Sequence, residues 1–146
     1  MNPVTGSCSR SLSGEQLPLK QRARFGQVLW CEFPIDAPPA EFHAEHPVVV
    51  IRSAKDLKDT CIVVPITTKI HPPSPTVHKL RRNYNPAAPT REVWVICSHI
   101  YTVGQERLRP FQHRGQQIVP RMDADDMADV VAALRAALPQ VFQLQP

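Results

Sequence analysis

HPVVVIRSAKDLKDTCIVVPITT, residues 46–68, contains two short runs of β-branched residues separated by a polar stretch. Valine and isoleucine are enriched in strands because their branched side chains pack well on a pleated surface. The charged stretch AKDLKD suits a solvent-exposed connection. The segment therefore predicts a pair of core strands. Pro65 has no N–H to donate to a sheet, so we expect an edge position or a bulge there.

The run that precedes this pair also predicts a strand. FGQVLWCEF, residues 25–33, alternates so that Val28 and Trp30 share one face while Leu29 and Cys31 share the other. A glycine and a proline bound it, as is typical of a short strand between turns. We expect both tryptophans of the chain to lie in apolar strands and to belong to the core.

Two proline-rich stretches predict surface loops. PIDAPPAEFHAEH, residues 34–46, cannot form a helix or a central strand because each proline lacks a donor and restricts the residue before it. Residues 70–90 leave room for one short strand at about residues 76–80, and we expect the remainder to be mobile. Tyr84 in that stretch is a candidate to stack on an unpaired base.

The second half of the chain adds strands and then changes its period. EVWVICSHIYTVG, residues 92–104, is the most continuous β-type run, and RLRPF and GQQIV predict one or two further strands. Five to seven short strands favour a small closed or nearly closed barrel. The apolar residues then follow a helical period, which predicts an amphipathic helix with the stripe Met127, Val130, Val131, Leu134 and Leu138.

The ends of that helix carry recognisable signals. Asp123 is the predicted N-cap, Asp125 and Asp126 suit the positive end of the helix, and Pro139 stops it. Capping and the helix dipole explain the acidic group, so we expect no metal site there. The sequence therefore predicts a mainly β (α+β) fold, which consists of a small barrel and a C-terminal amphipathic helix.

Composition sets the domain count and the compartment. Residues 1–23 are polar and without sustained periodicity, which predicts a flexible N-terminal arm, and residues 24–146 fit a single domain. No apolar run approaches the roughly 20 residues that cross a bilayer, so we expect no membrane segment and no secretory signal. The four cysteines, Cys8, Cys31, Cys61 and Cys97, lack zinc-site spacing. The last three lie in apolar runs, which is typical of reduced thiols in the cytoplasm.

Charge is distributed unevenly along the chain. Residues 25–65 hold three Lys or Arg against six Asp or Glu, whereas residues 66–121 hold nine against two. A basic segment of this kind favours a polyanion or an acidic protein partner. A solvated face that only confers solubility is the alternative.

Four segments, in order and with compatible gaps, resemble the MazF/PemK toxins of type II toxin-antitoxin systems. They are Gly26–Trp30, Pro47–Ile51, Val64–Thr68 and Ile100–Leu108, and the resemblance extends from Phe25 to Leu138. It implies an SH3-like barrel that forms a homodimer. It also implies sequence-selective cleavage of single-stranded RNA such as mRNA without a metal or cofactor, inhibition of growth, and a cognate antitoxin protein that blocks the groove.

The resemblance also assigns two catalytic positions. The family usually has an arginine before the proline of the second strand, with a threonine of the Pro-x-Thr segment as its partner at the phosphate. Here these positions hold His46 and Thr67. Imidazole lacks the permanent charge and the fork geometry of arginine, but it can act as acid or base. Ser98 and Ile96 are further departures, because some members have aspartate and arginine there.

Further residues are candidates for binding RNA. Metal-free cleavage needs a base for the 2′-hydroxyl, an acid for the leaving oxygen and positive donors at the phosphate. Two or three converging histidines would supply an acid–base pair, although a histidine in a proline-rich loop is more often solvated. The candidates are Glu41, His43, Thr68, Lys69, Arg81, Arg82, His99, Arg107 and Arg109.

Two functions follow. The first is a metal-independent endoribonuclease toxin in which His46 and Thr67 act at the scissile phosphate. The second is a non-catalytic binding protein on the same barrel, either a CcdB-like topoisomerase inhibitor or a degenerate toxin. The histidine at position 46 favours the second.

Overall fold

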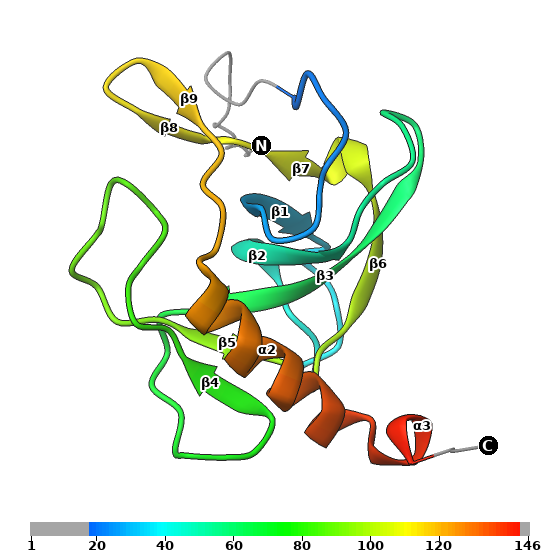
Figure 1. Cartoon of the computed structure of the whole chain (residues 1–146). Coiled ribbons are helices and arrows are strands. Elements are labelled where there is room, and N and C mark those ends of the chain that lie inside the picture. The colour runs from blue at the N-terminus through cyan, green and yellow to red at the C-terminus, as the bar shows by residue number, and fades with distance from the viewer. Residues whose placement is uncertain (1–17, 144–146) are drawn as a thin grey trace.

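The computed structural model describes residues 18–143, and in them strands precede one long helix (Figure 1). A 3-10 helix, η2 (Gln105–Arg107), interrupts the strands, and the helices α2 (Ala124–Ala137) and α3 (Pro139–Phe142) follow them. The strands are β1 (Val28–Phe33), β2 (Ala44–Arg52), β3 (Thr60–Thr67), β4 (Val77–Lys79), β5 (Trp94–Ile96), β6 (Tyr101–Gly104), β7 (Leu108–Arg109), β8 (Phe111–His113) and β9 (Gln116–Ile118). The protein is therefore mainly β with a C-terminal helix, as predicted.

The main sheet curls into an incomplete barrel. Its strand order is β4-β5-β3-β2-β1-β7, and β6 pairs with β3, all antiparallel. β6 and β7 lie at opposite ends of the path β6-β3-β2-β1-β7, but only η2 separates them in sequence. The chain thus returns to where the barrel starts, although no pairing between described residues closes the hydrogen-bonded sheet.

Side chains of the central strands alternate between two hydrophobic cores. Val48 and Val50 point into the barrel with Leu29 and Cys31, whereas Val49 faces the opposite core. That second core lies between the sheet and α2, which contributes Met127, Val130 and Ala133. The two faces of a strand alternate, so a strand that is buried on both sides is apolar throughout. This explains the uninterrupted valine and isoleucine runs of β2 and β3.

The predicted central pair of strands is confirmed by β2 and β3, but the prediction for Pro65 was wrong. Pro65 lies in a central strand opposite Val48. On the other side of β3, the pairing with β6 ends at Val63 and the pairing with β5 begins at Ile66. The proline therefore occupies the gap between two partners, where the ladder needs no donor from it.

The long run at residues 92–104 forms two strands rather than one. A turn at residues 97–100 separates β5 from β6, so the chain leaves one side of β3 and returns further along it. The C-terminal helix forms as predicted, and Met127, Val130 and Leu134 of its apolar stripe pack on the core, but Val131 and Leu138 are exposed. Asp123 caps α2 by accepting a hydrogen bond from the Asp126 N–H at 2.9 Å.

Part of the predicted N-terminal arm lies against the barrel. The Ala23 N–H donates to Gln105 Oε1, and Gln105 Nε2 donates to the carbonyl of Gln21 at 2.9 Å. Residues 1–17, which include most of the predicted arm, lie outside the described residues, and so does Cys8. Among the helices at residues 18–143, none is long and apolar enough to cross a bilayer.

Candidate functional site

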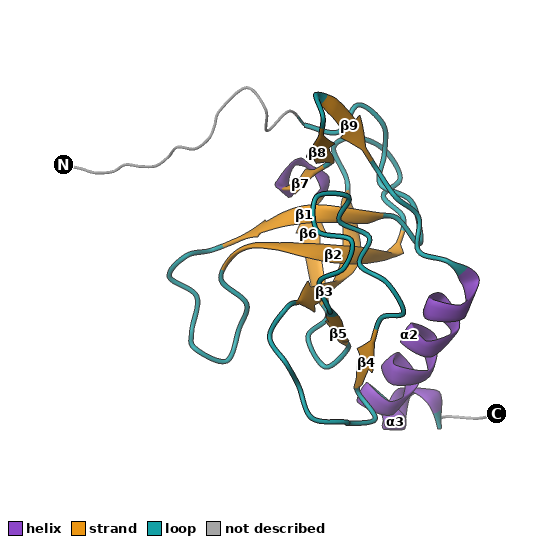
Figure 2. Ribbon diagram, turned by 90° about the vertical axis from the view of Figure 1, so that its left-hand side faces the viewer, coloured by secondary structure: helices purple, strands orange, loops and turns teal. Residues whose placement is uncertain are grey.

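The loop that joins β1 to β2 gathers three of the predicted histidines around one phenylalanine. Figure 2 shows this loop extending from the ends of the two strands. The Phe42 ring packs edge-on against the His46 ring, with centroids 4.9 Å apart, and against the His99 ring at 5.2 Å. His43 follows Phe42 in sequence and bonds within the loop. The rings of His46 and His99 therefore meet on one phenylalanine, an arrangement that the sequence alone could not establish.

Hydrogen bonds attach the β1–β2 loop to β6 and to the turn before it. The Tyr101 hydroxyl accepts from the Phe42 N–H at 3.0 Å, and His99 Nε2 lies 2.8 Å from the carbonyl oxygen of Ala40. Within the loop, His43 Nε2 is hydrogen-bonded to the carbonyl of Ala37. The loop is thus held over His46 by side chains of the β5–β6 turn and β6.

His46 lies half-buried in β2 beneath this loop. Burial lowers the pKa of its imidazole below the ordinary value of 6.5, and the carbonyls of His43 and Ile66 oppose that effect only in part. At neutral pH the ring is therefore uncharged. A neutral imidazole can accept a proton, but it cannot replace the permanent charge of an arginine.

Thr67 ends β3, one residue after the carbonyl that faces the His46 ring. Its side chain is nearly buried, and Oγ1 accepts a hydrogen bond from the Lys69 N–H at 3.1 Å. This bond uses the oxygen as an acceptor and leaves the hydroxyl proton available for a phosphate oxygen. Thr68 and Lys69 follow with exposed side chains.

The arginines in and beside β7, Arg109 and Arg107, lie next to β1. The Arg107 guanidinium is 5.7 Å from the centroid of the Phe33 ring, and its Nε donates to the carbonyl of Glu32. Arg109 lies opposite Trp30 of β1 and donates to the carbonyl of Glu106. Phe33 also faces the His46 ring at 6.3 Å, so Arg107 borders the histidine cluster.

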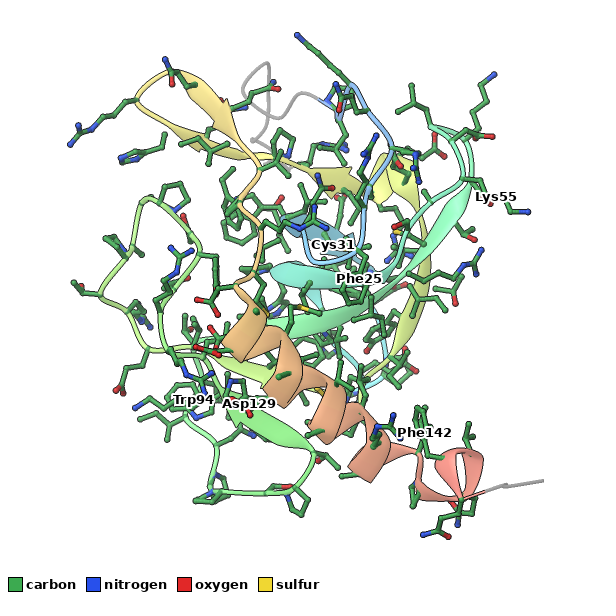
Figure 3. The ribbon with its side chains drawn as sticks, in the orientation of Figure 1. Phe25, Cys31, Lys55, Trp94, Asp129 and Phe142 are labelled. Carbon is green, nitrogen blue, oxygen red and sulfur yellow. The ribbon has the colours of Figure 1, made fainter. Side chains whose placement is uncertain are left out.

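Arg81 and Arg82 are not brought to this cluster. Arg81 pairs with two carboxylates of α2, Asp126 at 2.9 Å and Asp129 at 2.8 Å. Arg82 lies 3.8 Å from the Asp123 carboxylate. Figure 3 labels Asp129 on α2, beside β4. Their charge is thus largely neutralised at the helix, and the predicted guiding role for RNA has no support in the structure.

The stacking role predicted for Tyr84 was wrong. Its ring is buried, and its hydroxyl donates to Asp126 Oδ2 at 2.9 Å. His78, Asp126 and Asp129 also place ligand-type atoms within 4.8 Å of one another. Arg81 already supplies the positive charge for this acidic group, so the arrangement is explained as a structural anchor for α2.

Two aromatic residues of the cluster were missed at the sequence level: Phe33 and Phe42. Alternation in β1 identified Phe33 as inward-facing but gave no reason to place it beside a histidine. The Phe42–Tyr101 contact joins residues 59 positions apart, and no local pattern signals it. Glu41 in the β1–β2 loop is exposed, and its backbone N–H donates to the carbonyl of Pro38, which closes a turn at residues 38–41.

Comparison with known proteins adds to this geometry. A family model described as PemK-like, MazF-like toxin of type II toxin-antitoxin system matches residues 24–138. No curated protein matches the chain.

Three solved structures share the fold. An endoribonuclease in complex with its cognate antitoxin from a mycobacterial species is 17% identical, with a TM-score of 0.54, over 84% of this chain and 97% of that one. A second mycobacterial endoribonuclease is 20% identical, with a TM-score of 0.52, over 83% and 96%. MazF from Deinococcus radiodurans is 17% identical, with a TM-score of 0.57, over 81% and 97%.

Proposed function

Because the chain belongs to the family of PemK-like, MazF-like toxins of type II toxin-antitoxin systems, we propose that it is an endoribonuclease toxin. It cleaves single-stranded RNA, including mRNA, at selected sequences without a metal ion, and thereby inhibits growth. The observation that carries this proposal is the convergence of His46, His99 and the Ile66–Thr67 strand end under one loop.

The residues supply the groups that RNA transesterification needs. Neutral His46 takes the proton of the 2′-hydroxyl, whose oxygen then attacks the adjacent phosphorus. The Thr67 hydroxyl donates to a phosphate oxygen as charge develops, and Arg107 and Lys69 add positive charge. The bond to the 5′-oxygen breaks, and His99 is the group proposed to protonate it. The products are a 2′,3′-cyclic phosphate and a 5′-hydroxyl.

Partners and compartment follow from the same membership. We propose that the protein acts in the cytoplasm as a homodimer and that a cognate antitoxin protein holds it inactive. The similarity to an endoribonuclease crystallised with its antitoxin supports this arrangement. The exposed residues of the β1–β2 loop and the strand end at Thr68 and Lys69 are the surface such a partner must cover.

One observation favours a second function. His46 is uncharged at neutral pH and is packed against Phe42, which is a poor substitute for a phosphate-binding arginine. The alternative is therefore a non-catalytic protein of the MazF/CcdB type that binds RNA, antitoxin or topoisomerase without cleaving RNA.

The test is incubation of the purified protein with a long single-stranded RNA in EDTA. We expect discrete cuts with cyclic phosphate ends, and we expect them to disappear in His46→Ala and Thr67→Ala. His71→Ala, which changes a histidine outside the cluster, is the matched control and should cleave as the wild type does. Intact RNA with the wild-type protein would instead support the non-catalytic alternative.

The variant His46→Arg separates an adapted enzyme from a degenerate one. If His46 is the working base, arginine cannot replace it, because its guanidinium does not lose a proton in proteins. Cleavage should then fall. An increase in cleavage would show that the chain is a weakened enzyme that had lost its arginine.

A further inference from the structure

The second edge of β1 carries a row of arginines that begins at the histidine cluster. β2 covers one edge of β1 along its length, whereas β7 pairs with the other edge only at Trp30 and Cys31. On that other edge, Arg107 bonds to the carbonyl of Glu32, Arg109 lies opposite Trp30, and Arg121 lies opposite Gln27. Gln27, just before β1, and Glu32 are five residues apart, so at about 3.3 Å per residue the three arginines attach over about 17 Å of this edge. Trp30 and Gln27 face opposite sides of the strand, so Arg109 and Arg121 approach the edge from opposite faces.

Carboxylates accompany the Arg107 end of this row, where Glu32 of β1 lies opposite Glu45 of β2, so the uncompensated charge is that of Arg109, Arg114 and Arg121. Between Gly104 and Met122, Glu106 is the only acidic residue. The ion pairs among residues 18–143 do not include Arg109, Arg114 or Arg121. This contrasts with Arg81 and Arg82, whose charges are paired at α2. A row of unpaired guanidinium groups is suited to phosphate oxygens.

The row ends at an apolar hollow with an exposed aromatic ring. A cavity of about 530 Å³ lies between the start of β1 and α2, and Phe25, Arg121, Met122, Met127 and Val131 line it. Phe25 is 44% exposed, whereas Phe33 and Phe111 are buried. Gly26 has φ +87°, and the Arg121 side chain lies 3.6 Å from the position that a Cβ at Gly26 would take. The Arg121 side chain therefore packs beside the Gly26 backbone at the rim of the hollow.

An aromatic face beside an arginine is a binding arrangement for an unpaired base and its phosphate. Bases of single-stranded RNA stack on aromatic rings and on guanidinium planes, and the adjacent phosphates contact basic side chains. The cavity has the size of a small-molecule site. A duplex could not use it, because its bases are already stacked and paired.

The β8–β9 hairpin adds one more cation beside the row. Its base packs on β1 through the Phe111 and Trp30 rings, whose centroids are 5.3 Å apart. Figure 1 shows the hairpin projecting from the body of the protein. Arg114 and Gly115 at its tip both have positive φ, which forms a tight turn and exposes the Arg114 side chain.

We propose that the second edge of β1 is an RNA exosite: an RNA strand that leaves the histidine cluster follows Arg107, Arg109 and Arg121 and places an unpaired base against Phe25. This proposal rests on the proposed function, since it assumes that RNA occupies the cluster. It assigns a binding role to Phe25, Arg114 and Arg121, and it makes the protein prefer a long single strand to a short one.

The test measures binding apart from cleavage. Wild type, Phe25→Ala and the double variant Arg114→Asn/Arg121→Gln are titrated with RNAs carrying 2′-O-methyl groups, which cannot be cleaved. One RNA has about 16 nucleotides, enough for the cluster and the exosite, and the other has about 4. Asparagine is chosen at position 114 because it tolerates positive φ. The control Arg91→Gln/Arg135→Gln removes the same charge from exposed positions elsewhere.

We expect the long RNA to bind at least fivefold more weakly to Phe25→Ala, as loss of one stacked base predicts. The double variant should reduce the salt dependence of binding, with a slope lower by about 1.4 for two lost phosphate contacts. Binding of the short RNA should not change. Circular dichroism and thermal unfolding check that each variant is folded.

Three results would overturn the exosite. One is wild-type affinity of both variants for the long RNA. Another is an equal loss in the charge control, which would mean non-specific attraction. The third comes from a parallel titration with duplex DNA: it is a larger loss of affinity for the duplex than for the single-stranded RNA. The proposed function fails separately, if the wild-type protein leaves unmodified RNA intact while the exosite variants still lose binding.

Discussion

At the scale of single residues, His46 combines a family position with an unusual side chain. Burial lowers the pKa of its ring, so the form that can accept a proton is the main one at neutral pH. Because the His46 ring is neutral, it does not supply the positive charge that the family's arginine has at this position. If cleavage occurs, proton transfer rather than permanent charge must be what this position contributes.

This gives a pH dependence with a definite sign. As a base, His46 must be deprotonated, so the cleavage rate should rise from acid pH with a midpoint below 6.5, and it should fall again at more alkaline pH, where the proposed acid has lost the proton that it donates. Single-turnover cleavage between pH 4.5 and 8 measures it, with Thr67→Ser as the companion variant, which should keep the same midpoint at a lower rate. A midpoint above 6.5 would contradict a base in this half-buried position.

The resemblance to the toxin family assigned His46 and Thr67, and the strongly patterned strands β2 and β3 made their positions easy to align. The sequence could not identify Phe42 or its contact with Tyr101, because that contact depends on how a loop folds back across the barrel. It also overvalued Arg81 and Arg82. Net charge along the chain says nothing about the carboxylates that folding brings opposite each arginine.

At the scale of elements, α2 is held to the sheet by a buried carboxylate. Asp126 Oδ1 accepts from His78 and from the backbone and side chain of Arg81, and Oδ2 accepts from Tyr84. Burial raises the pKa of Asp126, but these hydrogen bonds outweigh it and bring the pKa below 3.8. This network orders part of the 70–90 stretch, which we had expected to be mobile.

Asp126→Asn should therefore destabilise the protein and change its response to acid. A depressed folded pKa contributes stability that is present above the unfolded value of 3.8 and is lost as pH falls through the folded value. We expect a loss of about 3 kcal/mol at pH 7 by urea unfolding, and a smaller loss at pH 3. Arg82→Gln, which removes an exposed pair with Asp123 and a contact with the Tyr84 ring but leaves the Asp126 carboxylate in place, is the control. Equal losses at both pH values would exclude the carboxylate as the cause.

The β1–β2 loop is attached to β6 by the hydrogen bond from the Phe42 N–H to the Tyr101 hydroxyl, and the strength of this attachment can be measured. Tyr101→Phe keeps the ring that packs on Phe33 at 4.8 Å but removes the acceptor for the Phe42 N–H. We expect amide exchange at residue 42 to become about fivefold faster, since a hydrogen bond contributes about 1 kcal/mol. Amides of β2 and β3 should be unaffected. Unchanged exchange at residue 42 would show that the aromatic packing alone holds the loop.

At the scale of the whole molecule, the predicted fold class is confirmed, but the pattern could not show how the barrel ends. Strand number and length follow from short β-branched runs, and the helix follows from its period and its cap. The open junction between β6 and β7, bridged by η2, depends on pairings between distant segments. The exosite escaped notice for the same reason, because Arg121 and Gln27 meet only in three dimensions.

The two cores make a prediction about thiol chemistry. Cys31 and Cys61 lie inside the barrel and Cys97 lies under α2, all without solvent exposure. Burial raises the pKa of Cys31 and Cys97 to about 12 and that of Cys61 to about 11, and only the thiolate reacts. In Cys8→Ser, which removes the cysteine outside the described residues, the folded protein should react with Ellman's reagent only as fast as it unfolds. All three thiols should react at once in urea. Rapid labelling of the folded variant would mean that one core opens to solvent far more often than its packing allows.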